Sequence, residues 1–304
     1  MTPAIDAFGS WWNSRPASLR GTVLLLVSML FFAVMLVLIR IAGQTLPVAE
    51  VVVTRTLIMQ VIILIQAGPA ARHILRTNNL RLQIVRGALS LGATWTSFVA
   101  VIYLPLALAT GISFTYAIFV TMGAALILRE SVSWKRWAAT LLGLAGVLIM
   151  IGPTQMGGLP YVAIALAGAV CGAGMILSVR KLDPAESIGT VLTYQGILVL
   201  PVMIVPLILT WQTPTPTEWL VLIAIGLIGT AGQWLLISAY QLTEAAKLAP
   251  LDFVRLVLMT GFGLVFFGES LSLSLGLGML LVVGTTIYTV RANNSGSPMP
   301  ERSA

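Results

Sequence analysis

Apolar runs of about 20 residues, the length that a helix needs to cross a hydrocarbon core, follow one another almost continuously from Gly21 to Val290. Short breaks rich in proline, glycine or polar residues separate these runs. Inside a bilayer the backbone must satisfy its own polar groups, so such runs form membrane-spanning helices. The fold class predicted is therefore an all-α integral membrane protein with ten transmembrane helices. The predicted spans are residues 20–40, 47–68, 81–103, 106–128, 134–151, 160–180, 187–210, 218–240, 247–267 and 271–290.

The composition agrees with a lipid environment. Hydrophobic residues make up 58% of the chain and charged residues only 9%, which lies far outside the range of soluble domains. The first apolar run resembles a signal peptide because Arg15 and Arg20 precede it, but no small-residue cleavage site follows, so it is expected to remain as a helix. The net charge of +7 is not gathered in one cluster, so no nucleic-acid partner is expected.

Basic residues are distributed unequally between the two sides of the predicted bundle. If the N-terminus is cytoplasmic, every Lys and Arg except Arg40, Arg55 and Arg255 falls on the cytoplasmic side, as the positive-inside rule requires. The segments 1–19 and 291–304 are then a cytoplasmic N-terminal segment and a cytoplasmic C-terminal tail. Arg40 is the one basic residue at the predicted outer edge.

The chain also repeats itself at an offset of 139 residues, which aligns the third and fourth spans with the eighth and ninth. Two halves of five spans result, at 20–151 and 157–290. Since five is odd, the second half enters the membrane from the opposite side and the repeats are inverted. Inverted repeats are an architecture of secondary transporters, in which the two copies exchange conformations to open alternate sides. The identical pairs include Trp95 and Trp234, Phe114 and Phe253, and Glu130 and Glu269.

Several local patterns resemble a known family. Arg55 lies early in the second span, Glu130 and Glu269 close the fourth and ninth spans, and glycines follow in the next span of each half. The stretch at 249–257, APLDFVRLV, begins the ninth span. With these features the chain resembles the EamA-type members of the drug/metabolite transporter superfamily over nearly its whole length. One departure is Gly111, which stands where the second half has a proline.

The resemblance implies a monomeric ten-helix carrier in the bacterial cytoplasmic (inner) membrane, with a central cavity lined by spans one to four and six to nine. The aromatic content of that cavity is similar to that of bacterial amino-acid exporters. We therefore expect a secondary or facilitative transporter that exports amino acids, aromatic or other apolar ones among them, or related small metabolites by alternating access. A carrier of nucleotide conjugates or drug-like solutes on the same scaffold, or a channel, stays open as an alternative.

Ionisable side chains within a membrane cost on the order of 2.5 to 3.5 kcal/mol each, so their presence needs a reason. Arg55 and Arg255 are candidates for recognising an anionic group, and Asp252 precedes Arg255 by three residues. Structural alternatives stay open for both arginines. Asp252 and Arg255 can pair on one helix surface, and Arg55 can pair with Glu50 or with lipid headgroups.

Aromatic and small polar side chains complete the candidate substrate site. Trp95 and Trp234 lie near the middle of their spans, away from the interfaces where tryptophan collects, so they line a cavity or pack between helices. Thr110 and Ser113 belong to a weakly polar stripe on the fourth span, which binds substrate or permits close helix packing. The remaining candidates are Phe98, Phe114, Tyr116 and Gln195.

Motifs of other function classes are missing from the sequence. A phosphate-binding loop of the G-x-x-x-x-G-K-[ST] type is absent, so neither ATP hydrolysis nor an ATPase subunit is implied. The zinc-protease and serine-hydrolase motifs are absent too, and the chain has one His and one Cys, so no enzyme, cofactor or metal site is expected. Because Asp252 is the one carboxylate clearly within a span, proton coupling is expected to be weak or absent.

Overall fold

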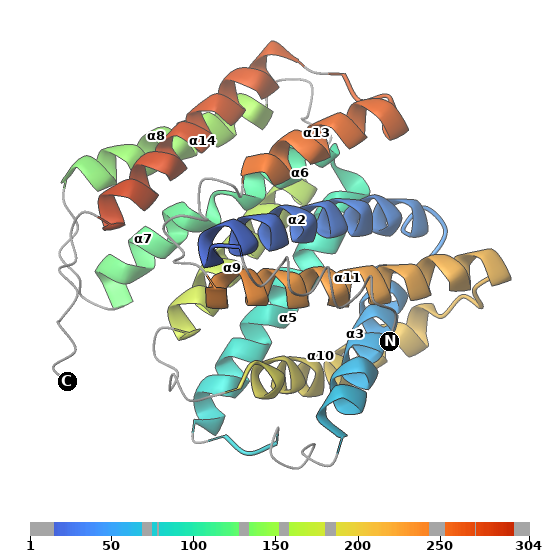
Figure 1. Cartoon of the computed structure of the whole chain (residues 1–304). Coiled ribbons are helices and arrows are strands. Elements are labelled where there is room, and N and C mark those ends of the chain that lie inside the picture. The colour runs from blue at the N-terminus through green and yellow to red at the C-terminus, as the bar shows by residue number, and fades with distance from the viewer. Residues whose placement is uncertain are drawn as a thin grey trace, which may run out of the picture.

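The protein is a bundle of α-helices in the computed structural model, which describes residues 15–68, 75–77, 79–127, 134–151, 158–179, 187–242, 253–270 and 272–294 (Figure 1). The first half contains α2 (Ala17–Ala42), α3 (Val48–Ala67), α5 (Leu80–Tyr103), α6 (Leu106–Ser113), α7 (Tyr116–Ile127) and α8 (Trp134–Ile151). The second half contains α9 (Leu159–Val179), α10 (Ile188–Thr210), α11 (Pro216–Leu242), α13 (Phe253–Phe267) and α14 (Leu273–Asn294). Strands are absent from the part of the chain that is described, and the predicted all-α membrane fold is confirmed.

Five of these helices, α2, α3, α5, α10 and α11, are by themselves long and apolar enough to cross a membrane. Shorter apolar helices cover much of the fourth, sixth, ninth and tenth predicted spans. The difference from ten uniform spans has two sources. The fourth span is divided, and several predicted span ends, such as 247–252, lie outside the described residues.

The break in the fourth span lies at Phe114 and Thr115, between α6 and α7. The Thr115 N–H donates to the Ile112 carbonyl at 3.0 Å, which is a tighter turn than that of an α-helix. The Ser113 and Thr115 hydroxyls donate to carbonyls three residues earlier, at 2.6 and 2.7 Å, and such bonds compete with the regular ladder. The fourth predicted span, 106–128, is therefore divided into two helices within its described residues, because hydropathy does not register these local bonds.

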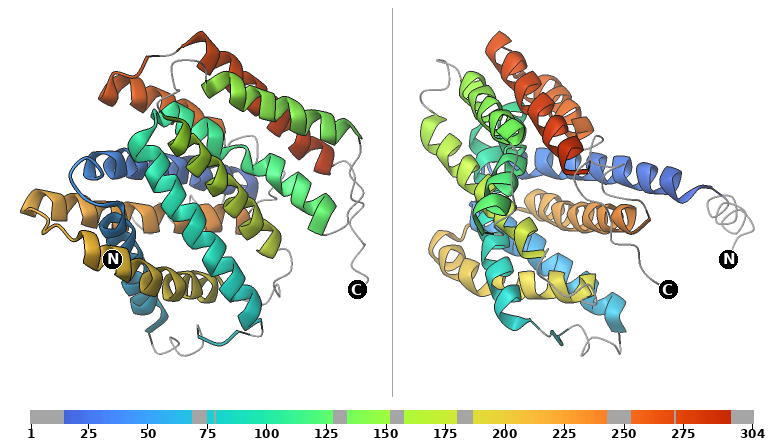
Figure 2. Two further views of the ribbon diagram at one scale, coloured as in Figure 1. Left: turned by 180° about the vertical axis from the view of Figure 1, so that it is seen from behind. Right: turned by 90° about the vertical axis from the view of Figure 1, so that its left-hand side faces the viewer.

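Helix pairing follows the predicted repeat. The repeat relates α2 to α9, α3 to α10 and α5 to α11. Accordingly, α2 packs against α11 as α9 packs against α5, and α3 packs against α11 as α10 packs against α5. Two further pairs, α3 with α10 and α8 with α14, join equivalent helices of the two halves (Figures 1 and 2). Each of these pairs joins a helix of one half to a helix of the other, so contacts between the halves position the candidate site residues.

One of these cross-half contacts, α5 with α9, depends on a glycine. A Cβ added to Gly168 on α9 would lie 2.3 Å from the Thr96 Oγ1 and 3.1 Å from its Cβ on α5. A Cβ added to Gly172, one turn further along α9, would have no neighbour within 4 Å. Gly168 is therefore one of the positions at which α5 and α9 come close together, and Gly172 is not.

Candidate functional site

Arg55 lies on α3, about 10 Å from the start of the helix, and its side chain is 7% exposed. Its Nη2 donates to the Gln233 Oε1 on α11 at 3.4 Å, and its Cζ lies 5.8 Å from the centre of the Phe98 ring on α5. The buried Nε has no hydrogen-bond partner among the residues that the structure describes. Gly229 on α11 leaves room for the side chain, since a Cβ there would lie 3.2 Å from Nε. Helices of both halves therefore enclose this guanidinium.

Arg255 occupies the first turn of α13 and meets the end of α6. Its Nη2 donates to the Ser113 Oγ at 3.3 Å, and its Cζ lies 5.3 Å from the centre of the Phe114 ring. The Ser113 hydroxyl in turn donates to the carbonyl of Thr110. Ser113 and Phe114, the partners of Arg255 among the described residues, thus lie at the break between α6 and α7. Non-helical backbone at membrane depth is tolerated only next to protein or a water-filled space.

The two arginines share one electrostatic property. Each contacts a phenylalanine ring and a neutral oxygen, whereas the ion pair found between described residues involves a different arginine, Arg40. Glu50, considered above as a partner of Arg55, instead accepts a hydrogen bond from the Gln212 N–H. Asp252 lies outside the described residues. Hydrogen bonds of 3.3 to 3.4 Å are long, so the guanidinium N–H groups retain capacity for a stronger acceptor.

The other predicted site residues divide into two groups. Phe98, Phe114 and Thr110 are buried beside the arginines, and Tyr116 is half-buried at the start of α7. Gln195 is buried on α10, and no hydrogen bond between described residues joins it to either arginine. Its predicted role in substrate binding stays a prediction.

Trp95 and Trp234 are alike in their surroundings, as their repeat relation predicts. Their side chains are 46% and 49% exposed, on α5 and α11 respectively. Each lies about 12 Å from the end of its helix, the indole of Trp95 near the Tyr103 end and that of Trp234 near the Leu242 end. Half of each indole surface is therefore left for lipid or solute rather than buried between helices.

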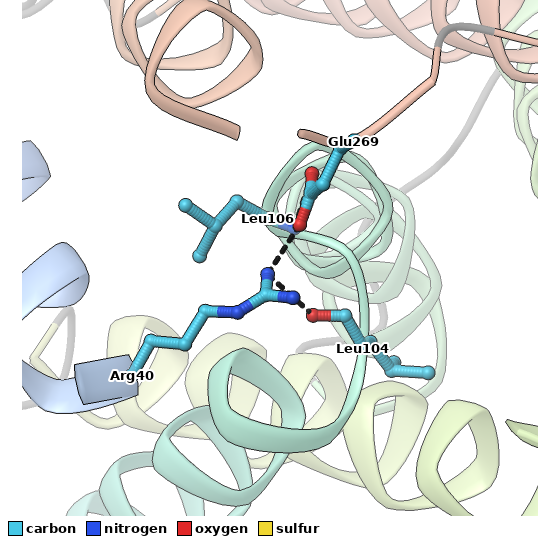
Figure 3. A network of polar contacts seen from close by, with 4 residues as sticks. All are labelled: Arg40, Leu104, Leu106 and Glu269. Atoms are coloured by element: carbon cyan, nitrogen blue, oxygen red, sulfur yellow. Dashed lines mark hydrogen bonds and ion pairs between the residues drawn. The ribbon is translucent and has the colours of Figure 1, made fainter. Parts of the chain in front are cut away.

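A second polar network was not predicted from the sequence (Figure 3). Arg40, in the last turn of α2, forms an ion pair with Glu269 in the connection between α13 and α14. The same guanidinium donates to the Leu104 carbonyl at 3.1 Å, and its Cζ lies 4.4 Å from the centre of the Phe267 ring. Both Glu269 carboxylate oxygens accept from the Leu106 N–H, at 2.8 and 3.0 Å. The one feature of the sequence that could have indicated this network is the position of Arg40, the single basic residue at the predicted outer edge.

Comparison with known proteins gives a family and several relatives. The model of the EamA-like transporter family matches residues 19–152 and again residues 159–291. A solved structure described as "Crystal structure of protein" has a TM-score of 0.60 at 19% identity and covers 91% of this chain and 99% of that one. This likeness shows the fold alone.

Relatives with names are similar over most of their length. A riboflavin transporter of Brucella anthropi is 27% identical over 79% of this chain and 86% of its own. An S-adenosylmethionine uptake transporter of Rickettsia prowazekii is 24% identical over 90% and 92%. A pseudopaline exporter of Pseudomonas aeruginosa is 28% identical over 86% and 93%. None of these three is named as an amino-acid exporter, so the narrower resemblance expected from the aromatic content is not supported.

Proposed function

Because the chain belongs to the EamA-like transporter family, we propose that it carries a carboxylate-bearing metabolite of the amino-acid type across the bacterial inner membrane by alternating access. The observation that supports this most strongly is the pair of arginines, Arg55 and Arg255, whose guanidinium groups contact neutral partners. A charged side chain within a membrane is costly and points to a functional site, and the partners described for these two arginines carry no charge.

A carboxylate suits these groups for geometric reasons. The guanidinium presents paired N–H donors that match two carboxylate oxygens, and such charged hydrogen bonds are shorter and stronger than those to amide or hydroxyl oxygens. The bonds from Arg55 to Gln233 and from Arg255 to Ser113 are long and easily exchanged for a better acceptor. A bound carboxylate would therefore replace weak contacts rather than break strong ones.

The phenylalanine rings extend the argument to the rest of the solute. Phe98 and Phe114 supply apolar surface beside the cations, so one molecule with a carboxylate and an apolar or aromatic part would satisfy both features. S-adenosylmethionine, named for one relative, also contains an amino-acid carboxylate. Drug-like cations are disfavoured by the two positive charges, whereas an anionic nucleotide conjugate is the second candidate that these charges admit.

The test is counterflow in liposomes that contain the purified protein. Radiolabelled aromatic, sulfur-containing and hydroxyl amino acids would be compared with their amides and with the corresponding amines, which lack the carboxylate. We expect saturable counterflow of one or more amino acids and little of the amides or amines. Equal transport of acid and amide would contradict the proposal, and unitary currents without counterflow would indicate a channel.

Two charge-removing variants test the assigned residues in the same assay. In Arg55→Gln and Arg255→Gln a charged hydrogen bond worth about 1.5–3 kcal/mol is lost, so the KM for the carboxylate substrate should rise about 10- to 100-fold. Arg81→Gln is the matched control, because Arg81 is exposed near the start of α5. Unchanged KM values in both site variants would remove these arginines from substrate recognition.

A further inference from the structure

The network around Arg40 and Glu269 joins three segments that meet at one end of the bundle (Figure 3). Arg40 lies in the last turn of α2, Leu104 and Leu106 flank the turn between α5 and α6, and Glu269 follows α13. The first two segments belong to the first half and the third belongs to the second half. The ion pair therefore crosses between the two repeats.

The local structure holds the Glu269 carboxylate in this position. Gly268 has a φ of 60°, a conformation that glycine adopts without strain, and it turns the chain after α13. The Glu269 N–H then donates to the Gly263 carbonyl at 3.0 Å. The carboxylate lies over α13, since a Cβ added to Gly263 would come 2.3 Å from its Oε2.

The partners of the carboxylate complete its hydrogen bonding. The first N–H groups of a helix have no partner within the helix, and Pro105, the residue before α6, has no side-chain oxygen to accept them. The Glu269 carboxylate accepts a hydrogen bond from the N–H of Leu106, which belongs to the other repeat. Leu106 lies at the N-terminal end of α6, where the helix dipole favours a negative charge. The Arg40 and Glu269 side chains are only 17% and 12% exposed. The ion pair, the hydrogen bond to the N-terminus of α6 and the burial of both side chains all stabilise the contact between the two halves at this place.

We propose that Arg40 and Glu269 form a latch that closes the carrier at its outer end and that breaks each time the carrier opens there. The proposal rests on the carrier function proposed above and on the predicted orientation, which places the end of α2 outside. In an inverted-repeat carrier the halves move against each other, so an ion pair between them at one end stabilises the state closed at that end. The described structure is then the outward-closed state.

Reaction with a membrane-impermeant maleimide, added outside intact cells, tests the latch without a known substrate. The reporter is Ala107→Cys in a Cys171→Ser background, because Ala107 is buried next to the Leu106 N–H. Glu269→Gln removes the charge, and Gly263→Ala displaces the carboxylate while keeping it. Gly261→Ala is the matched control, since a Cβ there meets nothing within 4 Å.

We expect the latch variants to label about tenfold faster than the parent and the Gly261→Ala control to match the parent. Equal labelling of all four proteins, or faster labelling only in inverted vesicles, would overturn the proposal. Because labelling uses no substrate, a wrong substrate class leaves this outcome unaffected.

Transport kinetics supply a second readout that a merely structural role would not move. Releasing the latch increases the fraction of carrier that is open outside, so the apparent KM should fall for outside substrate and rise for inside substrate. Opposite changes on the two faces support the latch. A KM that rises on both faces, or on neither, contradicts it.

Discussion

At the scale of single residues, phenylalanine rings stand beside the two arginines that we assign to the substrate. The guanidinium carbon of Arg55 lies 5.8 Å from the centre of Phe98, and that of Arg255 lies 5.3 Å from the centre of Phe114. An aromatic face attracts a cation but does not occupy its N–H donors in the plane of the guanidinium. A phenylalanine partner therefore holds the guanidinium in place, and the N–H donors at the edge of the guanidinium can still bind a carboxylate.

Replacing these rings by leucine should weaken transport without removing a charge. A cation–aromatic contact is worth about 0.5–1 kcal/mol, and about 2 when desolvated, so Phe98→Leu and Phe114→Leu should each raise the substrate KM about two- to thirtyfold. Counterflow kinetics measure the change. Phe266→Leu is the control, because this exposed ring contacts Phe262 instead. Equal KM values in all three variants would mean that the rings do not position the cations.

At the scale of secondary structure, packing separates positions that look equivalent in sequence. Gly168 and Gly172 are both small residues on the same face of an apolar helix, yet only Gly168 lies against the neighbouring α5. Similarly, the fourth span reads as one apolar segment, but hydroxyl groups at Ser113 and Thr115 accompany a break in it. Hydropathy records how much a segment prefers lipid, and it contains no information on which side of the helix has a neighbour.

Alanine substitutions at the two glycines test this difference. Gly168→Ala should destabilise the protein by about 1–3 kcal/mol, because the β-branched Thr96 has few ways to move aside. Gly172→Ala should be neutral or slightly stabilising, since alanine favours a helix. Thermal unfolding in detergent, followed by intrinsic fluorescence, compares the two. Equal midpoints would show that α5 and α9 separate enough to accept a methyl group.

At the scale of the whole molecule, the orientation predicted from charge determines which end of the bundle faces the cell. The described basic residues Arg76 and Arg81 lie on the side predicted to be cytoplasmic. Arg40 lies near the C-terminal end of α2, which is predicted to face outside. This asymmetry decides whether the ion pair of Arg40 with Glu269 acts outside or inside. The location of both termini in the cytoplasm stays a prediction.

Reporter fusions settle the orientation directly. An alkaline phosphatase that folds only outside the cytoplasm should be inactive after Ala304 and active when inserted at Thr213, in the exposed connection between α10 and α11. Insertion at Asn79, in a connection predicted to be cytoplasmic, is the matched control and should be inactive. The reverse pattern would place the latch on the cytoplasmic side.

The sequence by itself determined the fold class and the inverted repeat of this protein. Membrane insertion depends on the summed hydropathy of each segment, and the repeat survives as identical residues such as Trp95 and Trp234. The same approach selected Arg55 and Arg255, because a charge within an apolar run is visible without any knowledge of its neighbours. Whether they bind substrate stays a prediction.

Only the tertiary structure decided which of these residues meet. Arg55 contacts Gln233 across 178 positions of sequence, and Arg40 contacts Glu269 across 229. Such pairs depend on how far each helix is rotated about its axis and on which helix of the other half it packs against. Those two quantities are determined by side-chain packing between distant segments, to which hydropathy and local spacing are insensitive.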